Sequence, residues 1–226
     1  IHAVNSDGTM AVFNTLKDQN VSAWSIWNTD GNYTSIAVAF SDLYMVCKRV
    51  VNGATVYYLE KGDKDFYTDS SIYNPAVNSN VVTGLAHLEG KTVKVVGDGA
   101  VLLDRVVASG QITLERSVVS VRIGLEYDAT LKTMPISQDS GAGRNLAQEI
   151  RVNKVTLELS NSLGLIVNGN RLPDRRVGDP FDTVPTPFTG RKDTPILGWA
   201  KTQQITINHT DPVGMTILGI ALEVNG

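Results

Sequence analysis

The sequence is poor in the residues from which most metal and redox sites are built. It has one cysteine, Cys47, which rules out an internal disulfide and fits assembly in a reducing cytoplasm. Cys47 lies in an apolar run that we expect to be a strand, so we interpret it as a small buried hydrophobic residue and not as a nucleophile. The three histidines, His2, His87 and His209, are far apart and lack metal-ligand spacing. We therefore expect no metal site and no cofactor site.

Further absences narrow the class of protein. The chain has no apolar run near about 18 residues, so we expect no membrane span. Its net charge is −3, which disfavours tight nucleic-acid binding because such binding needs clustered lysine and arginine. Helical periodicity of useful length is lacking, and at most one helical turn is expected, at Leu85–Leu88. The chain begins at Ile1 without a signal segment, so we expect it to be part of a longer or processed polypeptide.

Strand-like alternation is what the sequence does contain, most clearly between Val82 and Met134. In three runs apolar residues alternate with polar ones, which predicts strands with one buried and one exposed face. Turns are expected at Gly97-Asp98-Gly99 and Ser109-Gly110, since glycine accepts positive φ. Four short strands bury little as a flat sheet, so we expect residues 81–135 to curl into a small β-barrel. The residues assigned to buried faces are Val93, Val95, Ile112, Leu114, Val119, Val121 and Ile123.

Asp-Gly and Asn-Gly dipeptides predict hairpins elsewhere. Asp7-Gly8 is expected to join 2–5 to 10–16, and Asn52-Gly53 to join 43–50 to 55–60. We assign residues 1–80 to a sheet pair of six antiparallel strands, or the end of a β-propeller-like region, followed by a polar linker at 63–80. Such a fragment exposes strand edges, so we expect more chain or a partner subunit beside it. The same dipeptides recur at Asp30-Gly31, Asp98-Gly99 and Asn168-Gly169.

Residues 136–226 are expected to form a closing β-sandwich after a flexible connection at 135–143. A strand is predicted over 150–159, where Asn153-Lys154 breaks the alternation and indicates a β-bulge. Five of the eight prolines fall in 168–195, a long loop that we expect to be draped on a neighbouring surface or ordered in an assembly. Two further strands, at 203–208 and 215–224, would complete the sandwich. All three segments together predict an all-β protein.

Acidic residues offer pairs but no convincing catalytic pattern. Asp98 with Asp104, or Glu115 with Glu126, could be paired as glycosidase carboxylates, which need a separation of roughly 5–10 Å across a cleft. With 23 acidic residues a chance pairing is always available, and Asp98 is better explained as a turn residue.

Basic residues are equally unspecific. Gly141-Ala142-Gly143-Arg144 lacks the Gly-Lys-Ser/Thr of a phosphate loop and is interpreted as a linker. Arg171, Arg175 and Arg176 could hold a phosphate, yet Asp174 and Asp179 neutralise them, which favours salt bridges within the loop or contacts to another subunit. We assign no catalytic, cofactor-binding or metal-binding residue.

Aromatic residues leave a binding role open. Trp24 and Trp27 differ by three positions and face opposite sides of a regular strand, so we expect one in the core and the other at an interface. The sequons at Asn20, Asn32 and Asn208 imply glycosylation only in a secretory setting. A sugar-stacking platform could draw on Trp24, Trp27, Trp199, Tyr57, Tyr58 and Tyr73.

Several blocks together resemble bacteriophage tail nozzle proteins (the tail tubular B type of short-tailed phages) and related prophage tail proteins. The blocks are GLAHLEGKTV at 84–93, DG at 98–99, GQITL at 110–114, VRIGLEY at 121–127 and LKTMP at 131–135, flanked by WSIWNTDG at 24–31 and VNGATVYYLE at 51–60, with VTLELSNSLG at 155–164, DPFDT at 179–183 and PFTG at 187–190 downstream. The resemblance covers most of the chain. It implies that 81–135 is similar to the small β-barrel of ubiquitin-activating enzymes.

This resemblance implies a structural and not an enzymatic role. Such proteins form a ring, of six copies in short-tailed phages, that builds the channel for DNA ejection and a platform for adaptor and fibre proteins. DNA would pass without sequence-specific binding, which fits a mildly acidic surface. The place implied is the tail of the virion, assembled in the bacterial host cytoplasm. Two alternatives stay open: a host-receptor or carbohydrate-binding tail module, and a polysaccharide depolymerase.

Overall fold

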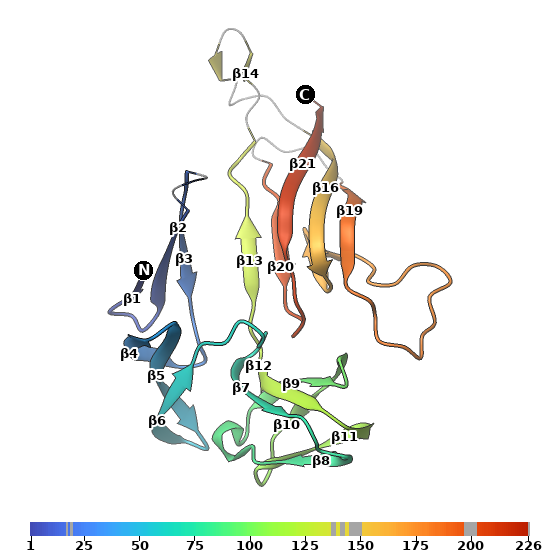
Figure 1. Cartoon of the computed structure of the whole chain (residues 1–226). Coiled ribbons are helices and arrows are strands. Elements are labelled where there is room, and N and C mark those ends of the chain that lie inside the picture. Colours follow the sequence, from blue (N-terminus) through green and yellow to red (C-terminus); the bar gives the residue numbers. More distant parts are fainter. Residues whose placement is uncertain are drawn as a thin grey trace. The chain divides into compact units, whose positions relative to one another are not determined.

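A computed structural model describes residues 1–16, 18, 20–136, 139–140, 143–144, 151–196 and 203–225. Over these residues the chain is built from antiparallel strands, with a 3-10 turn at Ala86–Leu88 and no α-helix, so the expected all-β class is confirmed (Figure 1). Consequently, none of the described segments is a helix that could cross a membrane. The chain divides into two compact units, Ile1–Tyr127 and Asp128–Gly226, and each is described by itself.

The first unit opens with two three-stranded sheets, ordered β1-β2-β3 and β4-β5-β6. Hairpins at Asp7-Gly8 and Asn52-Gly53 join β1 to β2 and β5 to β6, as the dipeptides predict. Both sheets contribute to one small core of five buried residues, Met10, Val12, Tyr33, Met45 and Cys47. Cys47 is fully buried, which confirms its interpretation as a core residue. The strands are β1 (His2–Val4), β2 (Met10–Leu16), β3 (Val21–Trp27), β4 (Asn32–Ala39), β5 (Asp42–Val51) and β6 (Ala54–Lys61).

Asp30-Gly31 is not a hairpin, although its dipeptide predicts one. The strands on either side, β3 and β4, lie in different sheets, so these residues carry the chain from one sheet to the next. Gly31 has φ of 131°, and a Cβ at this position would lie 2.1 Å from the carbonyl oxygen of Lys48. Glycine is therefore required here by the close approach of two backbones and not by a two-residue turn.

The rest of the first unit holds a four-stranded sheet, ordered β10-β9-β12-β7, and a two-stranded sheet, β11-β8. Both pack on a second core that includes Leu85, Leu88, Val93 and Ile123. The 3-10 turn at Ala86–Leu88 lies within the Leu85–Leu88 segment where one helical turn is expected. The strands are β7 (Asp69–Asn74), β8 (Ser79–Thr83), β9 (Thr92–Gly97), β10 (Ala100–Val106), β11 (Gln111–Val118) and β12 (Val121–Leu125).

The expected barrel at 81–135 is corrected by this arrangement. None of the sheets closes into a barrel over the residues that the structure describes. The residues at 63–80 are not simply a linker: β7 pairs with β12 and thereby occupies the sheet edge that a closed barrel would need. Residues at the end of the segment, Ala129–Lys132, form β13 and pair with a strand of the second unit.

Side-chain alternation in this segment is confirmed with one exception. Val93, Val95, Ile112 and Leu114 are at most 3% exposed, as are Val121 and Ile123. Val119 is 58% exposed, so its assignment to the buried face was wrong. It lies in the turn between β11 and β12, where Val118 takes the buried position instead.

The second unit contains two larger sheets around one core. One is ordered β19-β16-β21 and the other β13-β20-β17-β18, and Asn168-Gly169 forms the expected hairpin between β17 and β18. β16 shifts register between Val152 and Lys154, which confirms the β-bulge predicted at Asn153-Lys154. Val155, Leu157 and Leu159 are buried, as expected for the core face. The strands are β13 (Ala129–Lys132), β14 (Asp139–Ser140), β15 (Gly143–Arg144), β16 (Arg151–Ser162), β17 (Leu165–Val167), β18 (Asn170–Arg171), β19 (Phe188–Pro195), β20 (Thr206–His209) and β21 (Ile217–Asn225).

Candidate assembly surface

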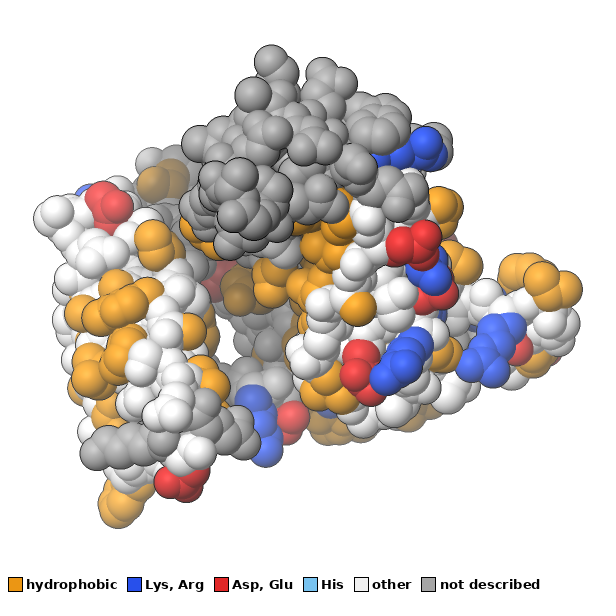
Figure 2. All heavy atoms as spheres, turned by 90° about the horizontal axis from the view of Figure 1, so that it is seen from above, with side chains coloured by type: hydrophobic (Ala, Val, Ile, Leu, Met, Phe, Trp, Pro, Cys, Tyr) orange, Lys and Arg blue, Asp and Glu red, His pale blue; other side chains and the backbone are white. Residues whose placement is uncertain are grey.

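Large apolar side chains are exposed on the N-terminal sheets. On β3, Trp24 is 67% and Ile26 73% exposed, and Phe40, which follows β4, is fully exposed. Figure 2 shows hydrophobic side chains gathered over this part of the first unit, at the left of the view. The exposed apolar residues of these sheets, which we call together the N-terminal apolar surface, lie on both sheets and on more than one face; they are Leu16, Val21, Trp24, Ile26, Val38, Phe40, Val50, Tyr57 and Leu59. These nine residues are as many as the five buried and four partly buried residues of the core between the sheets, a balance typical of a surface that a partner covers.

The outer strand of this surface, β3, lacks the usual protection of a sheet edge. It pairs with β2 along its whole length, from Met10 with Trp27 to Leu16 with Val21. Its other edge meets no strand among the described residues. The strand reads VSAWSIW and holds no charge and no proline, the two residue classes that commonly keep edges from pairing with other chains. β3 therefore offers both backbone groups and apolar side chains to a partner.

The two tryptophans of β3 take the separate positions that their spacing predicts. Trp27 is half-buried and packs on the first core. Trp24 faces outward and lies against Phe13 of the neighbouring strand, with ring centroids 4.8 Å apart. This cross-strand aromatic pair holds the Trp24 ring in place on the exposed face.

A buried ion cluster fixes the second sheet to the strand that follows it. Arg49 on β5 is 2% exposed and bonds Glu60 on β6 through Nε and Nη2 at 2.7 and 2.8 Å. The same guanidinium bonds both carboxylate oxygens of Asp69, on β7, at 2.8 and 2.9 Å. Asp69 also accepts hydrogen bonds from the Thr29 hydroxyl and the Asp30 backbone amide. The cluster therefore ties three strands and the crossover at residues 28–31 together.

Burial by itself would raise the pKa of the Asp69 carboxyl. Hydrogen bonds and charge from Arg49, with the hydrogen bonds from Thr29 and Asp30, outweigh that effect and hold its pKa below the ordinary value of 3.8. The carboxylate is thus a charged structural element.

This cluster was not predicted from the sequence, although the position of Arg49 among buried residues indicates it. Met45, Cys47, Arg49 and Val51 share one face of β5, so a cation stands in a row of buried residues. A buried cation requires carboxylate partners.

Beside this cluster the first unit has an aromatic hollow of about 910 Å³. His87 lies in it, with Nε2 3.4 Å from the Ser70 carbonyl oxygen and its ring edge-on to Tyr58. These contacts give His87 a packing role in the first unit. The rings that line the hollow belong to His2, Trp27, Tyr33, Tyr58, Phe66, Tyr67, His87 and Tyr127. Its size is that of a small-ligand site.

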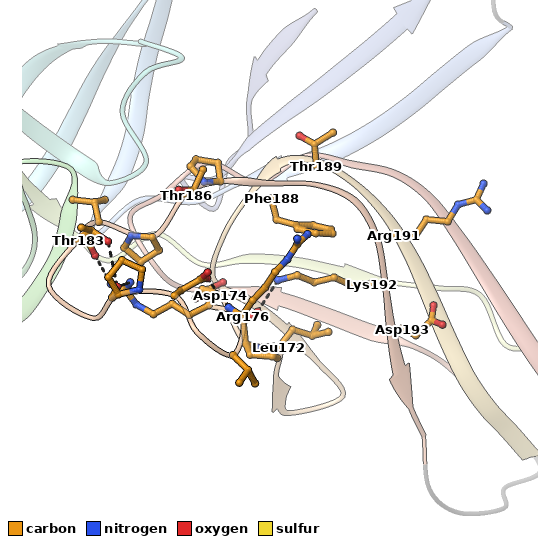
Figure 3. Close-up of a pocket in the computed structure, with 18 residues that line it drawn as sticks. Leu172, Asp174, Arg176, Thr183, Thr186, Phe188, Thr189, Arg191, Lys192 and Asp193 are labelled. Atoms are coloured by element: carbon orange, nitrogen blue, oxygen red, sulfur yellow. Dashed lines mark hydrogen bonds between the residues drawn. The ribbon is translucent and has the colours of Figure 1, made fainter.

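The proline-rich loop of the second unit lines a solvent-open hollow of about 950 Å³ (Figure 3). Arg175 donates to the carbonyl oxygens of Pro180 and Thr183, which closes the loop on itself. Arg171 forms ion pairs with Asp174 and Asp211, so the expected salt bridges within the loop are found for this residue. Val177 and Phe181 are almost fully exposed, and Figure 2 shows hydrophobic side chains at the tip of this loop, on the right.

Each of the four carboxylates that were considered as glycosidase pairs contacts another group of the first unit. Asp98 accepts hydrogen bonds from the amides of Val119 and Ser120 at 2.9 Å, which fits its interpretation as a turn residue. Ion pairs engage the other three: Asp104 and Glu126 with Lys94, and Glu115 with Arg105. The structure therefore gives each of them a stabilising contact.

His209 is buried, and its Nε2 lies 3.1 Å from the Leu163 carbonyl oxygen; burial lowers its pKa below 6.5. Within the described residues, no three His, Cys, Asp or Glu side chains are grouped to hold a metal ion. Gly143 and Arg144 form β15, which pairs with β14. Gly141, Ala142 and Trp199 lie outside the described residues.

No model of a known protein family matches the chain, and no curated protein matches it. The resemblance to phage tail nozzle proteins therefore stays a prediction from the sequence.

Proposed function

We propose that the chain is a structural component of a phage tail, a subunit of a nozzle ring that forms the DNA-ejection channel and a platform for adaptor and fibre proteins. The observation that carries the proposal is the N-terminal apolar surface. Its exposed side chains are as many as the hydrophobic side chains of the core between the sheets, and β3 presents an unprotected edge, so these sheets are suited to being covered by other subunits. The sequence blocks that resemble those of nozzle proteins indicate what kind of assembly it is. Copies would associate in a ring, with six expected.

In this role the chain acts mechanically. A net charge of −3 keeps the DNA phosphates from adhering to the channel wall, and DNA passes without sequence-specific contacts. No reaction and no cofactor is assigned to it. Its place would be the virion tail, after assembly in the bacterial host cytoplasm.

A pair of substitutions on β3 tests the proposal. Replacing Trp24 and Ile26 by serine removes exposed apolar area but no core contact, so the fold is retained while self-association is lost. The matched control is Leu103→Ser, which changes a side chain of 65% exposure on β10 in the same unit. Sedimentation equilibrium of the purified proteins at increasing concentration measures the subunit number. A wild-type protein that stays monomeric at high concentration would contradict the proposal.

A carbohydrate-binding or receptor-binding module is the second candidate, and the aromatic hollow favours it. Tyr67 and Tyr127 expose about 40% of their area at its rim, where a sugar ring could stack. Titration calorimetry with host-surface oligosaccharides tests this role, and Tyr67→Ala is the variant expected to lose binding. Cleavage of the same oligosaccharides would instead support the depolymerase, the remaining alternative.

A further inference from the structure

Two cations of the proline-rich loop share one aromatic ring. The Arg176 Cζ lies 5.3 Å and the Lys192 Nζ 5.0 Å from the centroid of the Phe188 ring. Figure 3 shows the ends of both side chains together beside this ring, while the neighbouring Arg191 points away from it. The sequence brings them together because Phe188 and Lys192 lie on β19 and Arg176 lies in the loop that leads into this strand. Two like charges beside one ring repel each other, and an anion placed between them would relieve that repulsion.

Neither cation has an anionic partner in the part of the chain that the structure describes. Lys192 donates to the Pro173 carbonyl oxygen at 2.7 Å, a neutral acceptor. Asp174, the nearest acidic residue along the chain, is paired with Arg171, and Asp179 accepts from the backbone amide of Arg176 and not from its guanidinium. Burial lowers the pKa of Lys192, the charge of Asp174 opposes this shift, and the charge of Arg176 adds to it. The pair is thus a positive site in which neither cation forms an ion pair with the nearby aspartate.

The surroundings restrict the kind of anion. Three aspartates, Asp174, Asp179 and Asp193, also line the hollow, so a polyanion such as a nucleic-acid backbone would meet repulsion along its length. Prolines and the exposed Val177 flank the cations with apolar area. This combination of positive charge and apolar area fits a single carboxylate that is flanked by apolar side chains. Such a carboxylate occurs in an acidic segment of a protein.

We propose that Arg176 and Lys192, beside Phe188, bind a carboxylate from an acidic segment of a second copy of this chain. Charge complementarity favours this occupant. Residues 168–195 carry five cationic and four acidic side chains, a net charge of +1, so the remaining residues carry −4 of a chain whose total is −3. The inference rests on the proposed function, because it supplies one contact for the ring of copies.

A comparison of two neighbouring residues tests it. Lys192→Glu and Arg191→Glu make the same change of charge on β19, but only Lys192 faces the Phe188 ring. In the full chain, Lys192→Glu is expected to weaken self-association by at least about tenfold, and Arg191→Glu by much less. Sedimentation equilibrium over a range of protein and NaCl concentrations measures both, and higher NaCl weakens the wild-type contact.

The self-association of the variants distinguishes the carboxylate contact from the proposed function. Equal self-association of the two variants would overturn the inference and leave the proposed function standing, whereas a monomeric wild type would overturn both. If circular dichroism shows that Lys192→Glu fails to fold, Arg176→Glu replaces it, since the Arg176 side chain is exposed. Loss of duplex-DNA binding on Lys192→Glu, with self-association intact, would also overturn the carboxylate assignment.

Discussion

Arg49 and Asp69 form a two-bond ion pair between strands, with Nη1 2.9 Å from one carboxylate oxygen and Nη2 2.8 Å from the other. The pair has a side-chain exposure of 2% for Arg49 and 14% for Asp69. It joins the sheet of β4, β5 and β6 to β7, the first strand of the following sheet. The first unit therefore depends on electrostatics at a point where its apolar core is small.

Replacement of Arg49 by methionine should destabilise the first unit strongly. Methionine fills similar volume but leaves the carboxylates of Glu60 and Asp69 in mutual repulsion and half-buried, and loss of one partner of a buried pair typically costs about 3–5 kcal/mol. Urea unfolding followed by tryptophan fluorescence measures the free energy of unfolding. Lys61→Met is the control, because the Lys61–Asp42 pair is exposed and screened by solvent, so its loss should change the free energy of unfolding far less. Equal losses in the two variants would contradict the role of the cluster.

Asp69 should make the stability of the first unit sensitive to acid. Because its pKa is lower in the folded chain than the ordinary value of 3.8, its contribution is complete well above pH 3.8 and is lost as the pH falls through the lowered folded pKa. Asp69→Asn lacks this titration. The difference in the free energy of unfolding between wild type and Asp69→Asn should therefore be largest near pH 7 and shrink below pH 4. A difference that stays constant over this range would rule out the linkage.

Substitution of Gly31 by alanine tests the close approach at the crossover. The new Cβ would stand 2.1 Å from the Lys48 carbonyl oxygen, and the φ of 131° is unfavourable for any residue with a side chain. Gly53→Ala is the matched control, since Gly53 also has positive φ, 77°, but no atom lies within 4 Å of its Cβ position. We expect Gly53→Ala to cost about 1 kcal/mol and Gly31→Ala clearly more. Thermal unfolding of both variants gives the comparison.

Cys47 should be inert in the folded protein. Burial raises the pKa of its thiol to about 12, and carboxylates such as Glu60 add to the shift, so almost no thiolate exists at pH 8. Iodoacetamide at pH 8 should modify it slowly in buffer and quickly in denaturant. Mass spectrometry of the alkylated protein follows both rates. Fast alkylation under native conditions would mean that the first core opens readily.

Local patterns in the sequence predicted much of the strand content but not the pairing between distant strands. Alternation and Asn-Gly or Asp-Gly turns were sufficient for the hairpins at Asp7-Gly8 and Asn52-Gly53, and the broken alternation at Asn153 marked the β-bulge. These features depend on neighbours a few residues apart. The pairing of β7 with β12 joins residues about 50 positions apart, and the polar run at 63–80 contains no pattern that predicts it.

The residues of the candidate assembly surface were also predicted only in part. The opposite orientations of Trp24 and Trp27 follow from strand geometry alone. The Phe188 site does not, because its two cations lie 16 positions apart and meet only through the fold of a loop with no periodic pattern.

The position of β16 between β19 and β21 has a consequence for synthesis. Leu157 pairs with Ile220, about 60 residues further along the chain, so the ribosome needs roughly 3–12 s to deliver the second neighbour after the first strand emerges. During that interval Val155, Leu157 and Leu159 have no complete sheet around them. Nascent chains on the same messenger RNA would then display identical unpaired strands at the same time. Chaperone occupancy of this stretch, and not the stability of the finished fold, would set the yield of protein.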